Sequence, residues 1–332
     1  MILHYGLTGF VQLEIHLSRL IGVDRLVQAG KCLLYNANQY SLILAAIKKT
    51  QMRKYLILTI LLVGLNNILL SQPKCDTLTF ESKGSKLVGY FYHSNQSDSP
   101  TLLFTQGFMD SGDIWNIGET LSNNGINVFQ FDFRGCHKSE GKQGLINSQE
   151  DIDAALIFLK SQEMVMKYGI DNEKIIVGGY SYGGHMSMIY AINHPEIKRI
   201  ISISGGDLGI FGDLVKSNPN LRKGYSDFFQ SIKKPNGPVD FAYDDPIQEL
   251  IDNQEYFYIL KQIDSLANVD IFLSGGLDDN VVNMEDYVLP LYRNLKKNKS
   301  IKVECKVYQS GHSYKGVSDK LLKDIENWIK KE

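Results

Sequence analysis

The chain has 332 residues, of which 43% are hydrophobic and 22% are charged, a balance typical of a folded globular protein. This composition excludes a disordered chain, a collagen and a protein with many membrane spans. The formal net charge is -2, so the chain lacks the basic excess typical of nucleic-acid binding. The cysteines are scattered without a CxxC pair, which argues against a zinc site. The sequence does not decide whether Cys75, Cys136 or Cys305 form a disulfide.

The first seventy residues have a composition of their own. Two basic residues follow Met52, and the apolar run 55–70 then leads to a small residue, which is typical of a secretory signal peptide. We therefore expect residues 1–51 to be an upstream over-extension or a non-catalytic leader, and residues 52–72 to be a signal peptide. The mature protein would then be secreted or periplasmic, with no stable membrane span. The alternative is an anchor over the run 55–70, although a membrane span needs about 20 apolar residues.

Residues 73–332 alternate short apolar strands with helices. The first two strands flank Gly84 and predict a hairpin, and Ser148 is expected to open a long helix with Glu150 and Asp151 in its first turn. This alternation predicts an α/β fold with a mostly parallel central sheet and helices on both faces. The predicted strands are 77–81, 86–92, 101–105, 127–131, 175–177, 200–204, 269–273 and 302–308. The predicted helices are 113–123, the one from Ser148, 182–194, 284–295 and 317–330.

Residues 207–265 interrupt this alternation with four prolines and a group of aromatic residues. We expect a cap or lid insertion over the C-terminal ends of the strands, where sheets of this type bind ligands. The aromatic residues would either line an acyl pocket or form a small core of the lid itself.

The segment 175–184 carries the strongest chemical signal. An apolar strand leads into Gly179-Tyr180-Ser181-Tyr182-Gly183, and a helix follows, so G-x-S-x-G lies in a strand–turn–helix context. Glycines two residues before and after Ser181 allow a tight turn that exposes the hydroxyl at a helix N-terminus. Since a serine hydroxyl is a weak nucleophile, it needs an adjacent base.

Two later strand ends supply partners for this serine. The strand 269–273 runs toward Asp278, and the strand 302–308 runs toward His312. The spacing from Gly275 favours Asp278 over the adjacent Asp279. In that case Asp279 would be a carboxylate that caps its loop. Three other histidines, His137, His185 and His194, lie before or inside the helix after Ser181. Cys136 is a competing nucleophile, but no histidine is placed to serve it better than Ser181.

From about residue 77 to 330 the chain resembles the α/β-hydrolase superfamily, nearest its lipase-like and prolyl-oligopeptidase-like serine hydrolases. The resemblance implies that Ser181 is the nucleophile, His312 the general base and acid, and Asp278 the carboxylate that orients the imidazole. It also implies an oxyanion hole made by the backbone N–H groups of Tyr182 and Phe108.

Two stretches of the sequence depart from the pattern of this superfamily. Gln106 stands where many relatives have a histidine before the glycine of the oxyanion loop. The stretch 131–141 resembles D-x-R-G-x-G-x-S-x-G but carries Cys136 and His137, and its Asp132 and Arg134 are interpreted as structural.

The sequence therefore predicts a serine hydrolase that cleaves a carboxylic ester or related acyl bond through an acyl-enzyme, without a metal or organic cofactor. The alternative is a peptidase of the prolyl-oligopeptidase or proline-aminopeptidase type, for which Glu249, Asp252 or Glu255 would meet a peptide amino group. A non-catalytic binding protein, a lyase or a haloperoxidase on the same scaffold remain further alternatives. The expected partner is a small acyl ester or a short peptide, not a nucleic acid.

Overall fold

The computed structural model describes residues 74–108 and 110–331. The predictions for the leader 1–51, the signal peptide 52–72 and the alternative anchor 55–70 lie outside these residues. Within the described ranges, no helix combines the length and the apolar character that a membrane span requires.

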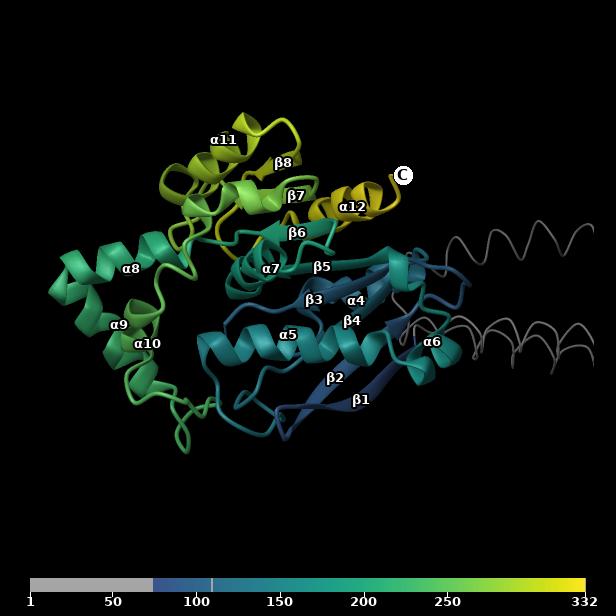
Figure 1. The fold of residues 1–332 in the computed structure, drawn as a ribbon, viewed down its shortest axis with the longest axis horizontal. Coiled ribbons are helices and arrows are strands. Elements are labelled where there is room, and N and C mark those ends of the chain that lie inside the picture. Colours follow the sequence, from purple (N-terminus) through teal and green to yellow (C-terminus); the bar gives the residue numbers. More distant parts are fainter. Residues whose placement is uncertain (1–73, 109, 332) are drawn as a thin grey trace, which may run out of the picture. The chain divides into compact units, whose positions relative to one another are not determined.

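An eight-stranded sheet forms the centre of the fold, in the order β1-β2-β4-β3-β5-β6-β7-β8 (Figure 1). The strands β1 and β2 form the predicted hairpin, β2 pairs with β4 antiparallel, and every other pair is parallel. The mostly parallel sheet of the sequence prediction is therefore confirmed. The strands are β1 (Lys74–Ser82), β2 (Ser85–His93), β3 (Thr101–Thr105), β4 (Asn127–Phe131), β5 (Ile175–Tyr180), β6 (Arg199–Ile203), β7 (Asp270–Gly276) and β8 (Lys302–Tyr308).

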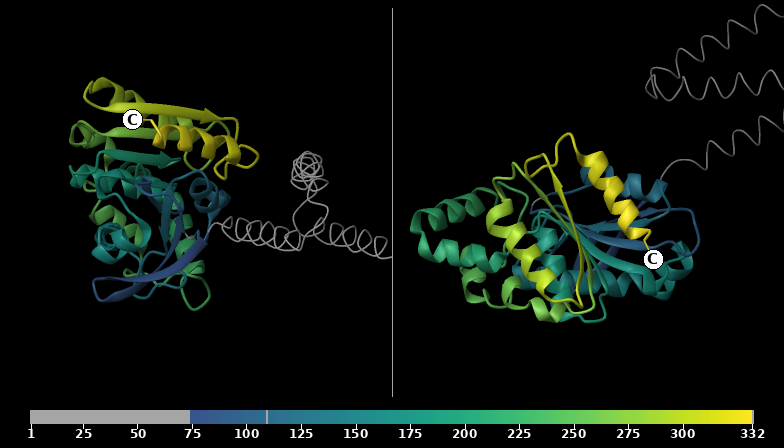
Figure 2. Two further views of the ribbon diagram at one scale, coloured as in Figure 1. Left: turned by 90° about the vertical axis from the view of Figure 1, so that its right-hand side faces the viewer. Right: turned by 90° about the horizontal axis from the view of Figure 1, so that it is seen from above.

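Helices cover both faces of the sheet, because successive side chains of each strand point to opposite faces. In β3, Leu103 belongs to the apolar cluster under α5, α7 and α11, whereas Leu102 and Phe104 belong to the cluster under α4 and α12. Figure 2 shows helices on both sides of the strands. The helices are α4 (Ile117–Asn123), α5 (Leu145–Leu159), α6 (Gln162–Tyr168), α7 (Tyr182–Asn193), α11 (Leu289–Lys297) and α12 (Ser318–Ile329), with short helical turns η1 (Ile114–Asn116), η2 (Asn172–Lys174) and η5 (Met284–Val288).

The segment predicted as an insertion folds into helices that gather at one end of the sheet (Figure 1). It contains α8 (Leu208–Ser217), α9 (Pro219–Ser231), α10 (Pro246–Asp252), η3 (Ile259–Lys261) and η4 (Ile263–Leu266). We call this segment the lid. Its residues 239–241 pair with the loop before α5, through isolated β-bridges from Cys136 to Val239 and from Gln143 to Phe241. The lid is thereby fastened to the sheet domain beside the C-terminal ends of the strands.

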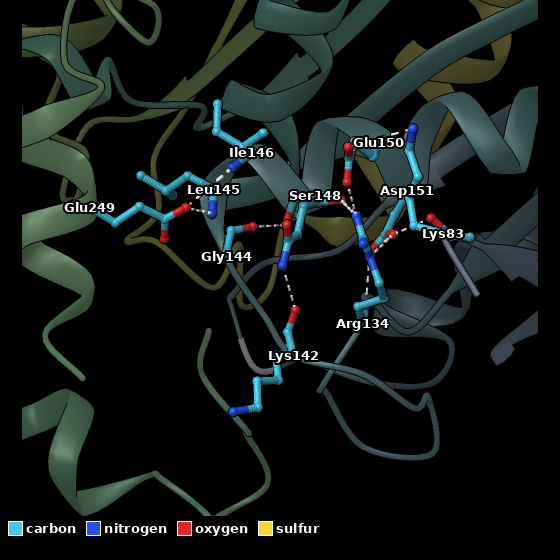
Figure 3. Close-up of polar contacts among 12 residues, drawn as sticks. Lys83, Arg134, Lys142, Gly144, Leu145, Ile146, Ser148, Glu150, Asp151 and Glu249 are labelled. Atoms are coloured by element: carbon cyan, nitrogen blue, oxygen red, sulfur yellow. Dashed lines mark hydrogen bonds and ion pairs between the residues drawn. The ribbon is translucent and has the colours of Figure 1, made fainter. Parts of the chain in front are cut away.

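The start of the long helix corrects the sequence prediction, because α5 begins at Leu145 and not at Ser148. Its N-cap, Gly144, has no side chain to cap the helix. Instead the carboxylate of Glu249 in α10 accepts hydrogen bonds from the N–H groups of Leu145 and Ile146 (Figure 3). The cap comes from a residue about a hundred positions away, so the local sequence pattern could not reveal it.

The earlier start of α5 also changes the role of its acidic residues. Glu150 and Asp151 lie beyond the first turn, where both pair with Arg134 (Figure 3). Asp151 also accepts a hydrogen bond from Ser82 at 2.7 Å. Arg134 therefore ties the loop after β4 to α5, which agrees with its interpretation as a structural residue.

Candidate active site

The turn between β5 and α7 places Ser181 at the edge of the sheet in a backbone conformation that few residues adopt. Ser181 has φ 52° and ψ -116°, a strained combination of the kind that clusters at functional sites. A Cβ on Gly179 would lie 2.4 Å from the carbonyl carbon of Gly183, and one on Gly183 would lie 2.1 Å from the oxygen of Thr105. The two glycines are thus required by contact distances, as the sequence motif predicts.

His312 lies on the loop after β8, and the structure brings its imidazole to the Ser181 hydroxyl. The Nε2 atom lies 2.9 Å from Ser181 Oγ, and Nδ1 lies 2.7 Å from Asp279 Oδ2. A single neutral tautomer satisfies both contacts, with Nδ1–H donating to the carboxylate and Nε2 accepting from the serine. This arrangement lets the imidazole remove the serine proton while its own charge is stabilised by Asp279.

The carboxylate that meets His312 is Asp279, so the prediction of Asp278 is wrong. β7 continues three residues beyond the predicted end at Leu273, and the two acidic side chains after it meet different partners. Asp278 is exposed and accepts a hydrogen bond from Gln309 at 2.7 Å. Asp279 is 2% exposed.

Asp279 combines the two roles that the sequence analysis separated. Its Oδ1 accepts hydrogen bonds from the N–H groups of Val281 and Val282, both at 2.8 Å, while Oδ2 meets His312. Burial raises the pKa of this carboxyl, but the hydrogen bonds from His312 and from the two backbone groups outweigh burial and hold the pKa below its ordinary value. Asp279 therefore stays ionised, as a partner of an imidazolium must.

The two predicted oxyanion residues lie beside the serine in the wall of one cavity, which Ser181 and His312 also line. Among the hydrogen bonds of the described residues, none is donated by the main-chain N–H of Phe108 or Tyr182. The loop that carries Phe108 is held by Gln106, whose Nε2 donates to the carbonyl of Gly112 and to Gln130. The departure from the usual histidine at this position thus leaves the loop anchored.

The competing residues of the sequence analysis lie in other settings. The His185 ring is buried and its Nδ1 contacts the carbonyl of Gly206 at 2.8 Å, whereas His194 contacts Glu196. Burial, together with the charges of Asp132 and Asp151, raises the pKa of the Cys136 thiol to about 12, which keeps this thiol protonated and a poor nucleophile. Cys75, Cys136 and Cys305 are free thiols, and no group of metal-ligating side chains occurs among the described residues.

The comparisons with known proteins agree with this architecture. Residues 100–244 match the family described as alpha/beta hydrolase fold. The chain is 32% identical over 139 residues to proline iminopeptidase of Saccharolobus solfataricus, and 32% identical over 126 residues to human alpha/beta hydrolase domain-containing protein 17B. These segments cover 42% and 37% of this chain, and the match spans 42% of the length of each of the two relatives.

Solved structures extend the likeness to most of the fold. Acetyl xylan esterase 1 from Thermoanaerobacterium sp. has a TM-score of 0.56 at 18% identity, over 79% of this chain and 85% of its own. Est1E from Butyrivibrio proteoclasticus, solved with ferulic acid bound, has a TM-score of 0.54 at 17% identity, over 76% and 97% of the two chains. The chain therefore has an α/β-hydrolase fold.

Proposed function

We propose that the protein is a serine hydrolase that cleaves a carboxylic ester, with Ser181 as nucleophile, His312 as general base and acid, and Asp279 as the orienting carboxylate. The observation that carries the proposal is the pair of contacts at His312, 2.9 Å to Ser181 Oγ and 2.7 Å to Asp279 Oδ2. Three side chains from the ends of three different strands meet in hydrogen-bonding order, which a purely structural serine turn does not require.

The proposed reaction proceeds in two stages. His312 takes the Ser181 proton as the oxygen attacks the ester carbonyl, and the oxyanion is held by the N–H groups of Phe108 and Tyr182. Each such donor contributes about 3 kcal/mol to the barrier reduction in comparable sites. The imidazolium then protonates the departing alcohol, leaving an acyl-enzyme. A water molecule that gives its proton to His312 hydrolyses this intermediate and restores Ser181.

Replacement of the nucleophile tests this proposal. Ser181→Ala is expected to abolish turnover of a p-nitrophenyl acyl ester, and it should also prevent labelling by a fluorophosphonate probe. The hydroxyl of Ser187 is a matched control, because it is buried six residues further along α7 and bonds the carbonyl of Gly183. If Ser181→Ala hydrolyses the ester and takes up the probe as the wild type does, the assignment is refuted.

Hydrolysis of a peptide bond is the second candidate function, favoured by the similarity to proline iminopeptidase over 42% of the chain. The same Ser181 and His312 would act on an amide. Rates on an ester and on an amide with the same acyl group, measured at equal enzyme concentration, separate the two functions. An enzyme that cleaves amino-terminal amides faster than the matched ester would replace the ester proposal.

We also propose that the natural protein is exported, on the basis of the sequence pattern 52–72 alone. The amino-terminal residue of the protein purified from its natural host tests this proposal. A mature chain that still contains residues 1–51 would contradict it.

A further inference from the structure

A cavity of about 450 Å³ lies between the lid and the serine turn. Its walls are mainly aromatic and aliphatic, with contributions from Phe108, Phe211, Tyr225, Phe228, Phe229 and Leu250. No lysine or arginine is among the described residues that line it. A cavity of this size and character suits an apolar group of several carbons, held in place by a few polar contacts.

Three acidic side chains line this cavity, namely Asp110, Asp207 and Glu249. Asp110 is exposed, and water therefore screens its charge. Asp207 is buried, and both of its oxygens are occupied: Oδ1 accepts from the N–H of Gly209 at 2.8 Å and Oδ2 from that of Leu260 at 2.9 Å. Asp207 therefore has little left to offer a ligand.

Glu249 differs from Asp207 because only one of its oxygens is used. The side chain is 3% exposed, and Oε1 accepts from Leu145 N–H at 2.8 Å and from Ile146 N–H at 3.4 Å. No hydrogen bond joins Oε2 to any residue that the structure describes, and Figure 3 shows this oxygen turned away from α5.

The free oxygen of Glu249 also remains within reach of the cavity. The described side-chain atoms that are both fully buried and without a partner are Gln106 Oε1, Asp132 Oδ2, Gln149 Oε1 and His185 Nε2, and Glu249 Oε2 is not among them. Since Oε2 has no partner either, it must be accessible, and it belongs to a side chain that lines the cavity. The hydrogen bonds to α5 fix the carboxylate, so Oε2 is presented as a rigid acceptor.

We propose that Glu249 Oε2 is a specificity-determining acceptor, and that the preferred substrate is an apolar ester whose enclosed part carries a hydrogen-bond donor, either a hydroxyl or an ammonium group. This inference rests on the proposed ester hydrolysis and adds the substrate class. A substrate without a donor leaves a buried carboxylate oxygen unpaired, and a site built around such a group rejects that substrate. We expect a difference of about 10- to 100-fold in kcat/KM.

The ionisation of Glu249 sets the conditions of the experiment. Burial raises the pKa of its carboxyl to about 7, although the N–H groups of Ile146 and Leu145 act in the opposite direction. Rates measured at pH 8 therefore report mainly on the ionised carboxylate, whose Oε2 can only accept a hydrogen bond.

A series of matched esters tests the proposal. The p-nitrophenyl esters of 3-phenylpropanoate and of its 4-hydroxy, 4-aminomethyl and 4-methoxy derivatives differ only at the far end of the acyl group. The wild type is expected to prefer the hydroxy and aminomethyl esters over the unsubstituted one by about tenfold or more. Comparison of these two arms shows whether a neutral or a cationic donor is favoured. Equal kcat/KM values across the series would overturn the proposal.

The variant Glu249→Gln reverses the chemistry at the free position without removing the helix cap. Its amide oxygen can still accept from Leu145 and Ile146, while its NH₂ group faces the cavity as a donor. The preference should shift from the hydroxy ester to the methoxy ester. Glu255→Gln makes the same change on the exposed surface of the lid and should keep the wild-type order. A wild-type preference that persists in Glu249→Gln assigns selectivity to another group and refutes the proposal.

A binding experiment keeps this inference separate from the proposed reaction. The amides of 3-phenylpropanoate and of its 4-hydroxy derivative are titrated calorimetrically into Ser181→Ala at pH 8, where turnover plays no part. Tighter binding of the hydroxy amide, lost when Glu249→Gln is added, supports the acceptor even if no ester is hydrolysed. Equal affinities of the two amides, or no binding of either, overturn it. Absence of ester turnover and of fluorophosphonate labelling would instead refute the proposed function.

Discussion

The hydroxyl of Tyr180 donates a hydrogen bond to the main-chain carbonyl of His312 at 2.9 Å. Tyr180 immediately precedes Ser181, so the turn that carries the nucleophile also holds the loop that carries the base. The Tyr180 ring lies 5.1 Å from the imidazole and 4.8 Å from the ring of Trp115, whose Nε1 donates to the carbonyl of Ser313. Burial, together with the charges of Asp110 and Asp279, raises the pKa of Tyr180, so its phenol remains a donor.

Tyr180→Phe removes this donor while keeping the ring. We expect kcat to fall about tenfold with KM unchanged, because a small displacement of the imidazole weakens proton transfer from Ser181 without altering the cavity. The measurement is steady-state kinetics on a p-nitrophenyl ester. Tyr190→Phe is the matched control, since it deletes a buried hydroxyl that bonds Asp153 at 3.0 Å further along α7. Equal losses in both variants would show a general effect on stability and not on positioning.

Neighbouring carboxylates provide a second test of the site. Asp279→Asn should lower kcat by about 10³-fold or more, because the amide cannot stabilise an imidazolium and favours the wrong tautomer of His312. Asp278→Asn should stay within about twofold of the wild type, since this exposed side chain contacts Gln309. Kinetics of the two variants on one ester give the answer. A larger loss in Asp278→Asn would restore the original sequence assignment.

Local pattern was sufficient to predict most of the framework of this site, but not the carboxylate. Ser181 and His312 follow strands whose ends were evident from apolar runs and glycines, and the structure brings these two side chains within 2.9 Å. The choice between Asp278 and Asp279 depends on where β7 ends, and a shift of one residue in a turn reverses the direction of a side chain. The sequence around Gly275 does not specify that end.

The start of α5 and the role of Glu249 could not be predicted for a different reason. A helix start is normally recognised from a capping residue next to it, and Ser148 provided a plausible one. The actual cap is the carboxylate of Glu249 in the lid, which accepts a hydrogen bond from the N–H of Leu145 about a hundred residues away. Glu249, Asp252 and Glu255 were equivalent in the sequence. In the structure Glu249 lines the cavity, whereas Asp252 and Glu255 are exposed.

The close packing of the serine turn predicts a large effect from one methyl group. Gly183→Ala should destabilise the fold strongly or prevent soluble expression, because its Cβ would lie 2.1 Å from the main-chain oxygen of Thr105. Neither atom can move away without a shift of the backbone. Gly224→Ala in α9 is the matched control. Nothing lies within 4 Å of its Cβ, so the helix should gain about 0.5–1 kcal/mol. Urea denaturation of both variants measures the changes, and a Gly183→Ala variant as stable as the wild type would contradict this account of the turn.

The buried imidazole of His185 predicts how stability depends on pH. Burial lowers its pKa to about 3, although the hydrogen bond with the Gly206 carbonyl opposes the shift. In the unfolded chain a histidine has a pKa of about 6.5, so between these values the unfolded state binds one more proton than the folded state. The stabilisation is therefore complete above about pH 6.5 and is lost as the pH falls toward 3, by at most about 1.4 kcal/mol per pH unit.

His185→Gln removes this titration and should flatten the decrease. The free energy of unfolding is measured by urea denaturation at pH 7.5, 6.5, 5.5 and 4.5 for the wild type and the variant. The variant will be less stable at pH 7.5, since it loses the ring that packs against Phe257, but the difference from the wild type should shrink at each lower pH. Carboxyl groups titrate in both proteins and cancel in that difference. A difference that stays constant from pH 7.5 to 4.5 would mean that His185 takes up its proton as readily in the folded chain as in the unfolded one, and the buried neutral imidazole would then be excluded.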